Sequence, residues 1–98
     1  MDFRIIKSPS RETLGILKHR MPLNGDEQLD GIDAVGLVQG KLIDMVCAAD
    51  IAEKTVDVIV RDVRGSCPQN MIMIAIFGET AAVENAMEQI KLEIDSYN

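Results

Sequence analysis

The residues best able to do chemistry lie in one short segment, residues 64–70, between two strongly apolar runs. Gly65 and Pro68 favour a turn, and Pro68 has no N–H group to donate to a strand ladder. We therefore expect Cys67 to be displayed at the tip of a strand–turn–strand unit rather than buried. A deprotonated thiol at such a position is either a nucleophile or a soft metal ligand. The segment consists of Arg64, Gly65, Ser66, Cys67, Pro68, Gln69 and Asn70.

The rest of the sequence does not indicate catalysis by this chain alone. A nucleophile needs a nearby base, and the only histidine, His19, lies at the end of a predicted helix, where positive charge complements the dipole. Gly36 and Gly40 stand too far apart for a phosphate-binding loop. The two cysteines, Cys47 and Cys67, are not spaced for zinc. We therefore predict no catalytic residue and no enzymatic activity.

The composition indicates a single domain that works within an oligomer. The 98 residues leave no room for a second domain, and 47% of them are hydrophobic, which is much apolar surface for a short chain to bury alone. The net charge of −6 argues against nucleic acid and anionic membranes as partners. No apolar run is long enough to span a bilayer, and no signal-peptide pattern is evident. We expect a cytoplasmic protein with reduced cysteines.

The first part of the chain predicts a strand, a helix and a linker. We expect a short strand over residues 3–7, after which Ser8 caps and Pro9 opens a helix that Pro22 ends. The apolar face of this helix comprises Leu14, Leu17 and Met21. Residues 23–31 are polar and turn-prone, which predicts a linker on the surface.

The second part begins with a predicted strand over residues 33–38 and a long helix over residues 40–54. This helix is apolar over more than half of its girth, so it must bury two faces. One face can pack on the sheet, and we expect the other to contact a second subunit. The face assigned to the sheet comprises Leu42, Met45, Val46 and Ala49. The face assigned to the subunit contact comprises Ile43, Cys47 and Ile51, with Cys47 as a small buried hydrophobic residue.

Two further strands and a helix complete the predicted fold. Residues 56–63 and 71–77 are rich in the Val and Ile that favour strands, and the last helix buries a stripe from Val83 to Ile94. The order is strand, helix, linker, strand, helix, strand, strand, helix. This order predicts an α+β fold in which helices pack on an antiparallel sheet.

An ordered series of segments resembles the bacterial microcompartment (BMC) shell domain over residues 32–95. The series comprises residues 32–38, Ala48-Ala49-Asp50 with Lys54 behind them, residues 58–60 and residues 76–84. In common members a strand and a helix follow the last helix of this series. Here they come before the whole series, as in circularly permuted shell proteins. The resemblance therefore implies one permuted BMC domain over residues 1–98, with residues 1–22 as the permuted strand and helix and residues 32–98 as the rest of the core.

The resemblance implies a structural protein of the microcompartment shell with defined partners. Family members form flat cyclic homo-hexamers that tile with other shell proteins around encapsulated enzymes, and Lys54 aligns with the lysine of the hexamer edge. The loop that lines the central pore of such hexamers corresponds here to Arg64, Gly65, Ser66, Cys67, Pro68 and Gln69. The motif Gly65-Ser66-Cys67-Pro68 resembles that of permuted shell proteins from glycyl-radical-enzyme microcompartments, a subfamily associated with an iron–sulfur cluster.

The chemistry of the loop is consistent with a cluster shared between subunits. A cluster needs about four ligands, usually thiolates, whereas one chain supplies one loop cysteine, Cys67. Cyclic symmetry repeats that cysteine around one axis, so we expect a 4Fe–4S cluster at the pore, with Arg64 offsetting its negative charge. Two alternatives remain open. One is a shell pore that passes small polar metabolites without a cluster, and the other is a regulatory α+β domain that binds a small ligand between subunits of a dimer or trimer.

Overall fold

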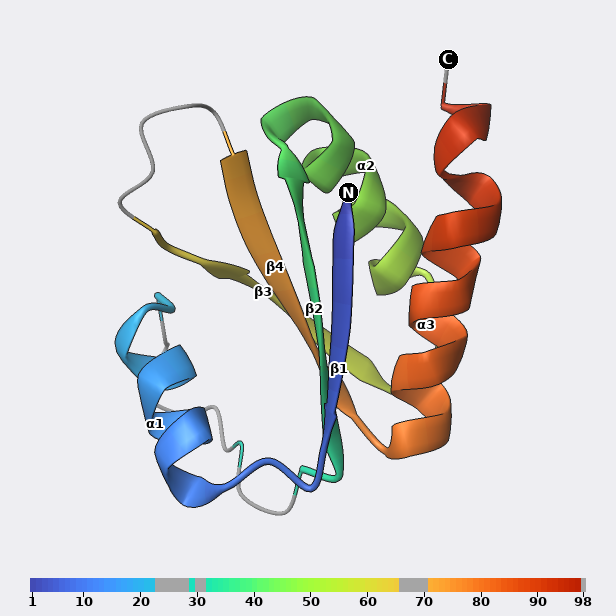
Figure 1. Ribbon diagram of the computed structural model, residues 1–98. Helices are drawn as coiled ribbons and strands as arrows, with labels where there is room; N and C mark the ends of the chain where they lie inside the picture. Colours follow the sequence, from blue (N-terminus) through green and yellow to red (C-terminus); the bar gives the residue numbers. More distant parts are fainter. Residues whose placement is uncertain (23–28, 30–31, 66–70, 98) are drawn as a thin grey trace.

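The computed structural model describes residues 1–22, 29, 32–65 and 71–97 (Figure 1). Within these residues the chain forms four strands and three α-helices, with a 3₁₀ turn after the last helix. The strands are β1 (Asp2–Lys7), β2 (Ala34–Lys41), β3 (Val58–Val63) and β4 (Met71–Gly78). The helices are α1 (Arg11–His19), α2 (Leu42–Glu53) and α3 (Thr80–Glu93), and the 3₁₀ turn η1 covers Ile94–Ser96. The predicted order of elements is confirmed.

The strands form one antiparallel sheet in the order β1-β2-β4-β3. The central pair β2 and β4 is in register over its whole length, from Ala34 opposite Gly78 to Lys41 opposite Met71. The sheet and its covering helices confirm the predicted α+β class. Because β3 and β4 are neighbours in the sheet, residues 64–70 must connect their ends.

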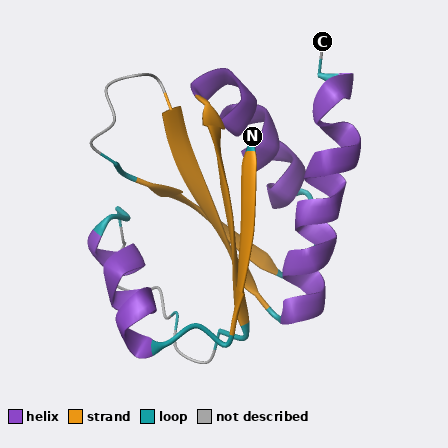
Figure 2. Ribbon diagram, in the orientation of Figure 1, coloured by secondary structure: helices purple, strands orange, loops and turns teal. Residues whose placement is uncertain are grey.

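Helices cover both faces of this sheet (Figures 1 and 2). Helices α2 and α3 lie on one face and α1 lies on the other. Successive residues of β4 alternate between two cores, because Ile76 belongs to the cluster beneath α2 and α3, whereas Phe77 belongs to the cluster beneath α1. A strand that is buried on both faces reads as an unbroken apolar run, which explains the composition of residues 71–77.

The start of α1 differs from the prediction. Ser10, and not Ser8, is the N-cap residue, and its side chain accepts a hydrogen bond of 3.1 Å from the backbone N–H of Thr13. Ser8 instead adopts a positive φ of 50° and donates its backbone N–H to the carbonyl of Asp33 at 2.7 Å. This hydrogen bond joins the end of β1 to the residue before β2, so Ser8 belongs to the sheet margin. Pro9 therefore precedes the cap.

Other boundaries also differ from the predicted ones: α1 ends at His19, before Pro22, and β3 begins at Val58 rather than at residue 56. Strand β2 continues to Lys41, with Gly40 paired to Ile72, so α2 begins at Leu42 rather than at Gly40.

The predicted surface linker, residues 23–31, lies outside the described residues except for Leu29. Leu29 is fully buried in the core beneath α1. The expectation that the whole linker is on the surface is therefore wrong at this position.

Candidate functional site

The segment singled out by its cysteine connects the ends of two hydrogen-bonded strands. The last paired residues before the connection are Val63 and Met73, where β3 and β4 end at one edge of the sheet. Arg64 and Gly65 are exposed at the root of this connection. Ser66, Cys67, Pro68 and Gln69 lie outside the described residues. The exposure of Cys67 at the tip of this connection therefore stays a prediction. The arrangement of two paired strands joined by this segment is confirmed.

The end of α1 is attached to the root of this connection. The backbone N–H of Arg64 donates to the carbonyl of Arg20 at 2.7 Å. The guanidinium of Arg20, through Nη1, donates in return to the carbonyl of Arg64 at 3.3 Å. The two residues are 44 positions apart in sequence, and no local pattern in the sequence could have indicated the pairing. The role of Arg20 at this connection was therefore not predicted.

One chain offers the right type of ligand for an iron–sulfur cluster, a cysteine thiolate, but too few of these ligands. Thiolate sulfur is the usual ligand of such clusters, and the Gly65–Pro68 motif contributes one cysteine, Cys67. The other cysteine, Cys47, is a free and half-buried thiol on α2. The described residues hold no group of three or more His, Cys, Asp or Glu side chains that could bind a metal ion. A cluster at this loop would therefore need cysteines from several copies of the chain.

Helix α2 presents an apolar face that is not covered by its own chain. Leu42, Ile43 and Val46 are 48%, 73% and 60% exposed. A hollow of about 360 Å³ lies beside Leu42 and Val46. Its other apolar lining residues are Met45, Ala49, Val60, Ile72 and Ile74. This apolar face of α2 is therefore free to contact another molecule.

The predicted assignment of the two faces of α2 is only partly confirmed. Ile43 is exposed as predicted, but Ile51 is 4% exposed and belongs to the core beneath α2 and α3. Leu42 and Val46, which were assigned to the sheet, are exposed instead. The error arises because α2 is apolar on nearly all sides. The sequence shows that two faces are apolar but does not fix which one turns inward.

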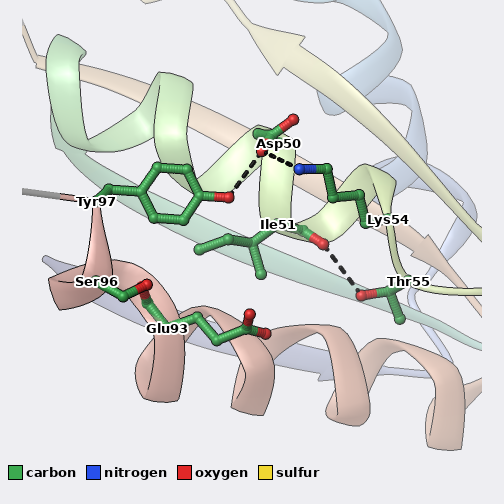
Figure 3. A network of polar contacts seen from close by, with 7 residues as sticks. All are labelled: Asp50, Ile51, Lys54, Thr55, Glu93, Ser96 and Tyr97. Atoms are coloured by element: carbon green, nitrogen blue, oxygen red, sulfur yellow. Dashed lines mark hydrogen bonds and ion pairs between the residues drawn. The ribbon is translucent and has the colours of Figure 1, made fainter.

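Lys54 caps the end of α2 and takes part in a three-residue polar network (Figure 3). Its Nζ lies 2.8 Å from Oδ2 of Asp50, and the hydroxyl of Tyr97 donates to the same oxygen at 2.7 Å. The network attaches the end of the chain to α2. Lys54 itself is 71% exposed and remains accessible to other molecules. The spacing of four residues between Asp50 and Lys54 is visible in the sequence, but the contribution of Tyr97 is not.

Hydrogen bonding within this network shifts three pKa values. The hydrogen bonds from Lys54 and Tyr97 lower the pKa of Asp50. The carboxylate of Asp50 in turn raises the pKa of Lys54 and that of Tyr97. Because the pKa of Asp50 is lower in the folded chain, its contribution to stability is present at neutral pH and is lost as acid protonates it. The contribution is small, since all three groups face solvent.

Comparison with known proteins gives matches among solved structures. The chain is 49% identical to the ligand-free GrpU microcompartment shell protein from Clostridiales bacterium 1_7_47FAA, covering 93% of this chain and 88% of that one, with a TM-score of 0.72. It is 39% identical to the ligand-free GrpU microcompartment shell protein from Pectobacterium wasabiae, covering 92% and 99%, with a TM-score of 0.75. No protein-family model and no curated protein matches the chain. No helix in the described part of the chain is long and apolar enough to cross a membrane.

Proposed function

Because the chain belongs to the family of GrpU microcompartment shell proteins, we propose that it is a shell subunit that assembles as a cyclic hexamer. The identity of 49% over 93% of the chain is the observation that carries this conclusion. Membership of a shell-protein family confirms the predicted resemblance and the structural, non-enzymatic role. The circular permutation, the hexamer and the assignment of residues 64–69 to a pore belong to the proposal.

The apolar face of α2 supports assembly with further copies of the chain. An exposed apolar patch on a small domain marks an interaction surface when it is contiguous. Leu42, Ile43 and Val46 lie within two turns of one helix, and a hollow beside Leu42 and Val46 can receive an apolar side chain. In a shell built from many copies, the occupant we propose for this face is the neighbouring subunit. A cyclic ring satisfies such a contact in every subunit at once.

The mass of the particle in solution tests the hexamer. Light scattering should give about six times the 10.8 kDa of one chain. A dimer or trimer would contradict the hexamer and would favour the alternative of a regulatory domain that binds a ligand between subunits. Electron micrographs of the same sample should show flat sheets or tubes, because shell proteins assemble by tiling.

We propose that Lys54 makes the contact between neighbouring hexamers. Lys54→Asp should leave the mass of the hexamer unchanged and abolish sheets in electron micrographs, because it places a negative charge at an exposed edge position. Asp50→Asn removes the charge of the partner of Lys54 but keeps the lysine, and it should still form sheets. Lys7→Asp, at an exposed position at the end of β1, is the matched control for the change of charge. Sheets that persist in Lys54→Asp, or that also vanish in Lys7→Asp, would contradict this role.

We further propose that Cys67 from several subunits binds an iron–sulfur cluster at the pore of the hexamer, as in shells around glycyl-radical enzymes. The support is the Gly65-Ser66-Cys67-Pro68 motif and the need of a cluster for several thiolates that one chain cannot supply. When bound, such a cluster can carry electrons or be passed across the shell. The alternative is a pore that passes small polar metabolites, in which Cys67 has no ligand role.

A further inference from the structure

A basic hollow lies where α1 meets the root of the β3–β4 connection. It has a volume of about 330 Å³ and is lined by His19, Arg20, Met21, Arg64 and Gly65. We call it the root groove. A second hollow of about 210 Å³ also has Arg20, Arg64 and Gly65 in its lining. The two arginines therefore stand between two concave surfaces.

The charge of the root groove contrasts with that of the whole chain. The chain carries a net charge of −6, yet three basic side chains converge here. Among the described residues, no carboxylate forms an ion pair with His19, Arg20 or Arg64. Arg20 uses one donor on the carbonyl of Arg64, and a guanidinium has five N–H donors in all. Within the described part of the chain, donors for an anionic ligand therefore remain.

The dipole of α1 explains only part of this cluster. Basic residues near a helix C-terminus complement its partial negative charge, which accounts for His19 and Arg20. Arg64 is not on the helix, because it follows β3 and is brought to the end of α1 by the backbone hydrogen bond to Arg20. That hydrogen bond holds the two arginine backbones together. The pairing needs no second positive charge, so the dipole of α1 does not explain why residue 64 is an arginine.

Gly65 leaves open space beside the arginines. A Cβ atom built at Gly65 meets no heavy atom of the described residues within 4 Å, so their packing does not require glycine here. Gly65 is also exposed, and its backbone can be approached by a ligand. A glycine that packing does not require, next to two arginines, permits an anion to come close to the main chain.

We propose that the root groove binds small phosphate-bearing anions. Planar guanidinium groups recognise phosphate oxygens through paired N–H donors, and two arginines match the double negative charge of a phosphate group. The described residues that line the root groove all come from one chain, so we expect binding without the hexamer. If the hexamer also forms, each subunit would carry one such site beside the proposed pore, which would concentrate anions there.

Phosphorus NMR of inorganic phosphate tests this site on the assembled wild-type protein. As protein is added at constant ionic strength, the phosphate signal should broaden and the broadening should reach a plateau. The dissociation constant should be on the order of millimolar. The double variant Arg20→Gln/Arg64→Gln should weaken binding at least about tenfold. Gly65→Val, which fills the open space, should also weaken it. Arg11→Gln removes one positive charge at the far end of α1, as each substitution of the double variant does near the groove, and should bind as the wild type does.

Several outcomes would overturn the site. One is broadening that never reaches a plateau and that added chloride suppresses to the extent expected from its ionic strength alone. Another is an equal loss in Arg11→Gln, since this would show only general attraction. Acetate in competition separates phosphate recognition from carboxylate recognition, and equal competition by acetate would contradict the preference for phosphate. Circular dichroism of the double variant checks that the fold is intact, and Gly65→Val repeats the test without removing a charge.

Discussion

Ile51→Asp should prevent the chain from folding, whereas Ile43→Asp on the same helix should leave the fold intact and break the assembly. Ile51 is 4% exposed in the core beneath α2 and α3, and Ile43 is 73% exposed. An unpaired charge in a closed apolar core costs several kcal/mol, of the order of the whole stability of a domain, which is about 5–15 kcal/mol. At Ile43 the same charge meets water in the single chain and becomes buried only when a second subunit covers it.

Circular dichroism and light scattering separate the two outcomes. Ile43→Asp should keep the wild-type spectrum but give the mass of a single chain or of a small oligomer, whereas Ile51→Asp should lose the folded spectrum at every concentration. Ile16→Asp is the matched control, because Ile16 is 64% exposed on α1, at the opposite face of the sheet. A hexamer that persists in Ile43→Asp would contradict the proposed subunit contact. Equal dissociation in Ile16→Asp would place the contact elsewhere or make it nonspecific.

The contrast between these two isoleucines marks the limit of sequence reasoning on this chain. Periodicity predicted the order of elements, because strands with an unbroken apolar run and helices with apolar stripes are local features. The rotation of α2 about its own axis is not local, since it depends on how the helix sits on the sheet. A helix that is apolar on nearly all sides gives no signal for that rotation, and so Ile51 and Val46 were assigned to the wrong faces.

The contacts that hold the candidate sites together were also beyond the sequence. Arg20 and Arg64 meet only because α1 packs across the sheet and ends beside β3. Tyr97 reaches Asp50 only because α3 and η1 run alongside α2. The cysteine motif at Cys67, by contrast, is a local pattern, and sequence alone was enough to single it out. Long-range contacts have no local signature, whereas a loop motif and its turn residues do.

Cys67→Ser should abolish iron–sulfur binding without affecting assembly. Wild-type protein that is purified or reconstituted without oxygen should be brown, with broad absorption in the visible range, because thiolates are the ligands that iron–sulfur clusters use. Serine is a poor substitute, since its hydroxyl is harder and stays protonated at neutral pH. The variant should be colourless with an unchanged particle mass, because residues 64–70 connect two strands whose core contacts lie elsewhere. Visible absorption, iron analysis and light scattering on one preparation measure all three properties.

Cys47→Ala is the control for this experiment. Cys47 is half-buried on α2, so its loss should leave the colour unchanged. The amount of iron adds an independent test, because ligands that converge on one axis predict about one cluster per hexamer rather than one per chain. Colour that survives in Cys67→Ser, or about four iron atoms per chain, would contradict a cluster shared at the pore. Wild-type protein that stays free of iron after reconstitution would favour the alternative, a pore that passes small polar metabolites, while the shell assembly would still stand on its own measurements.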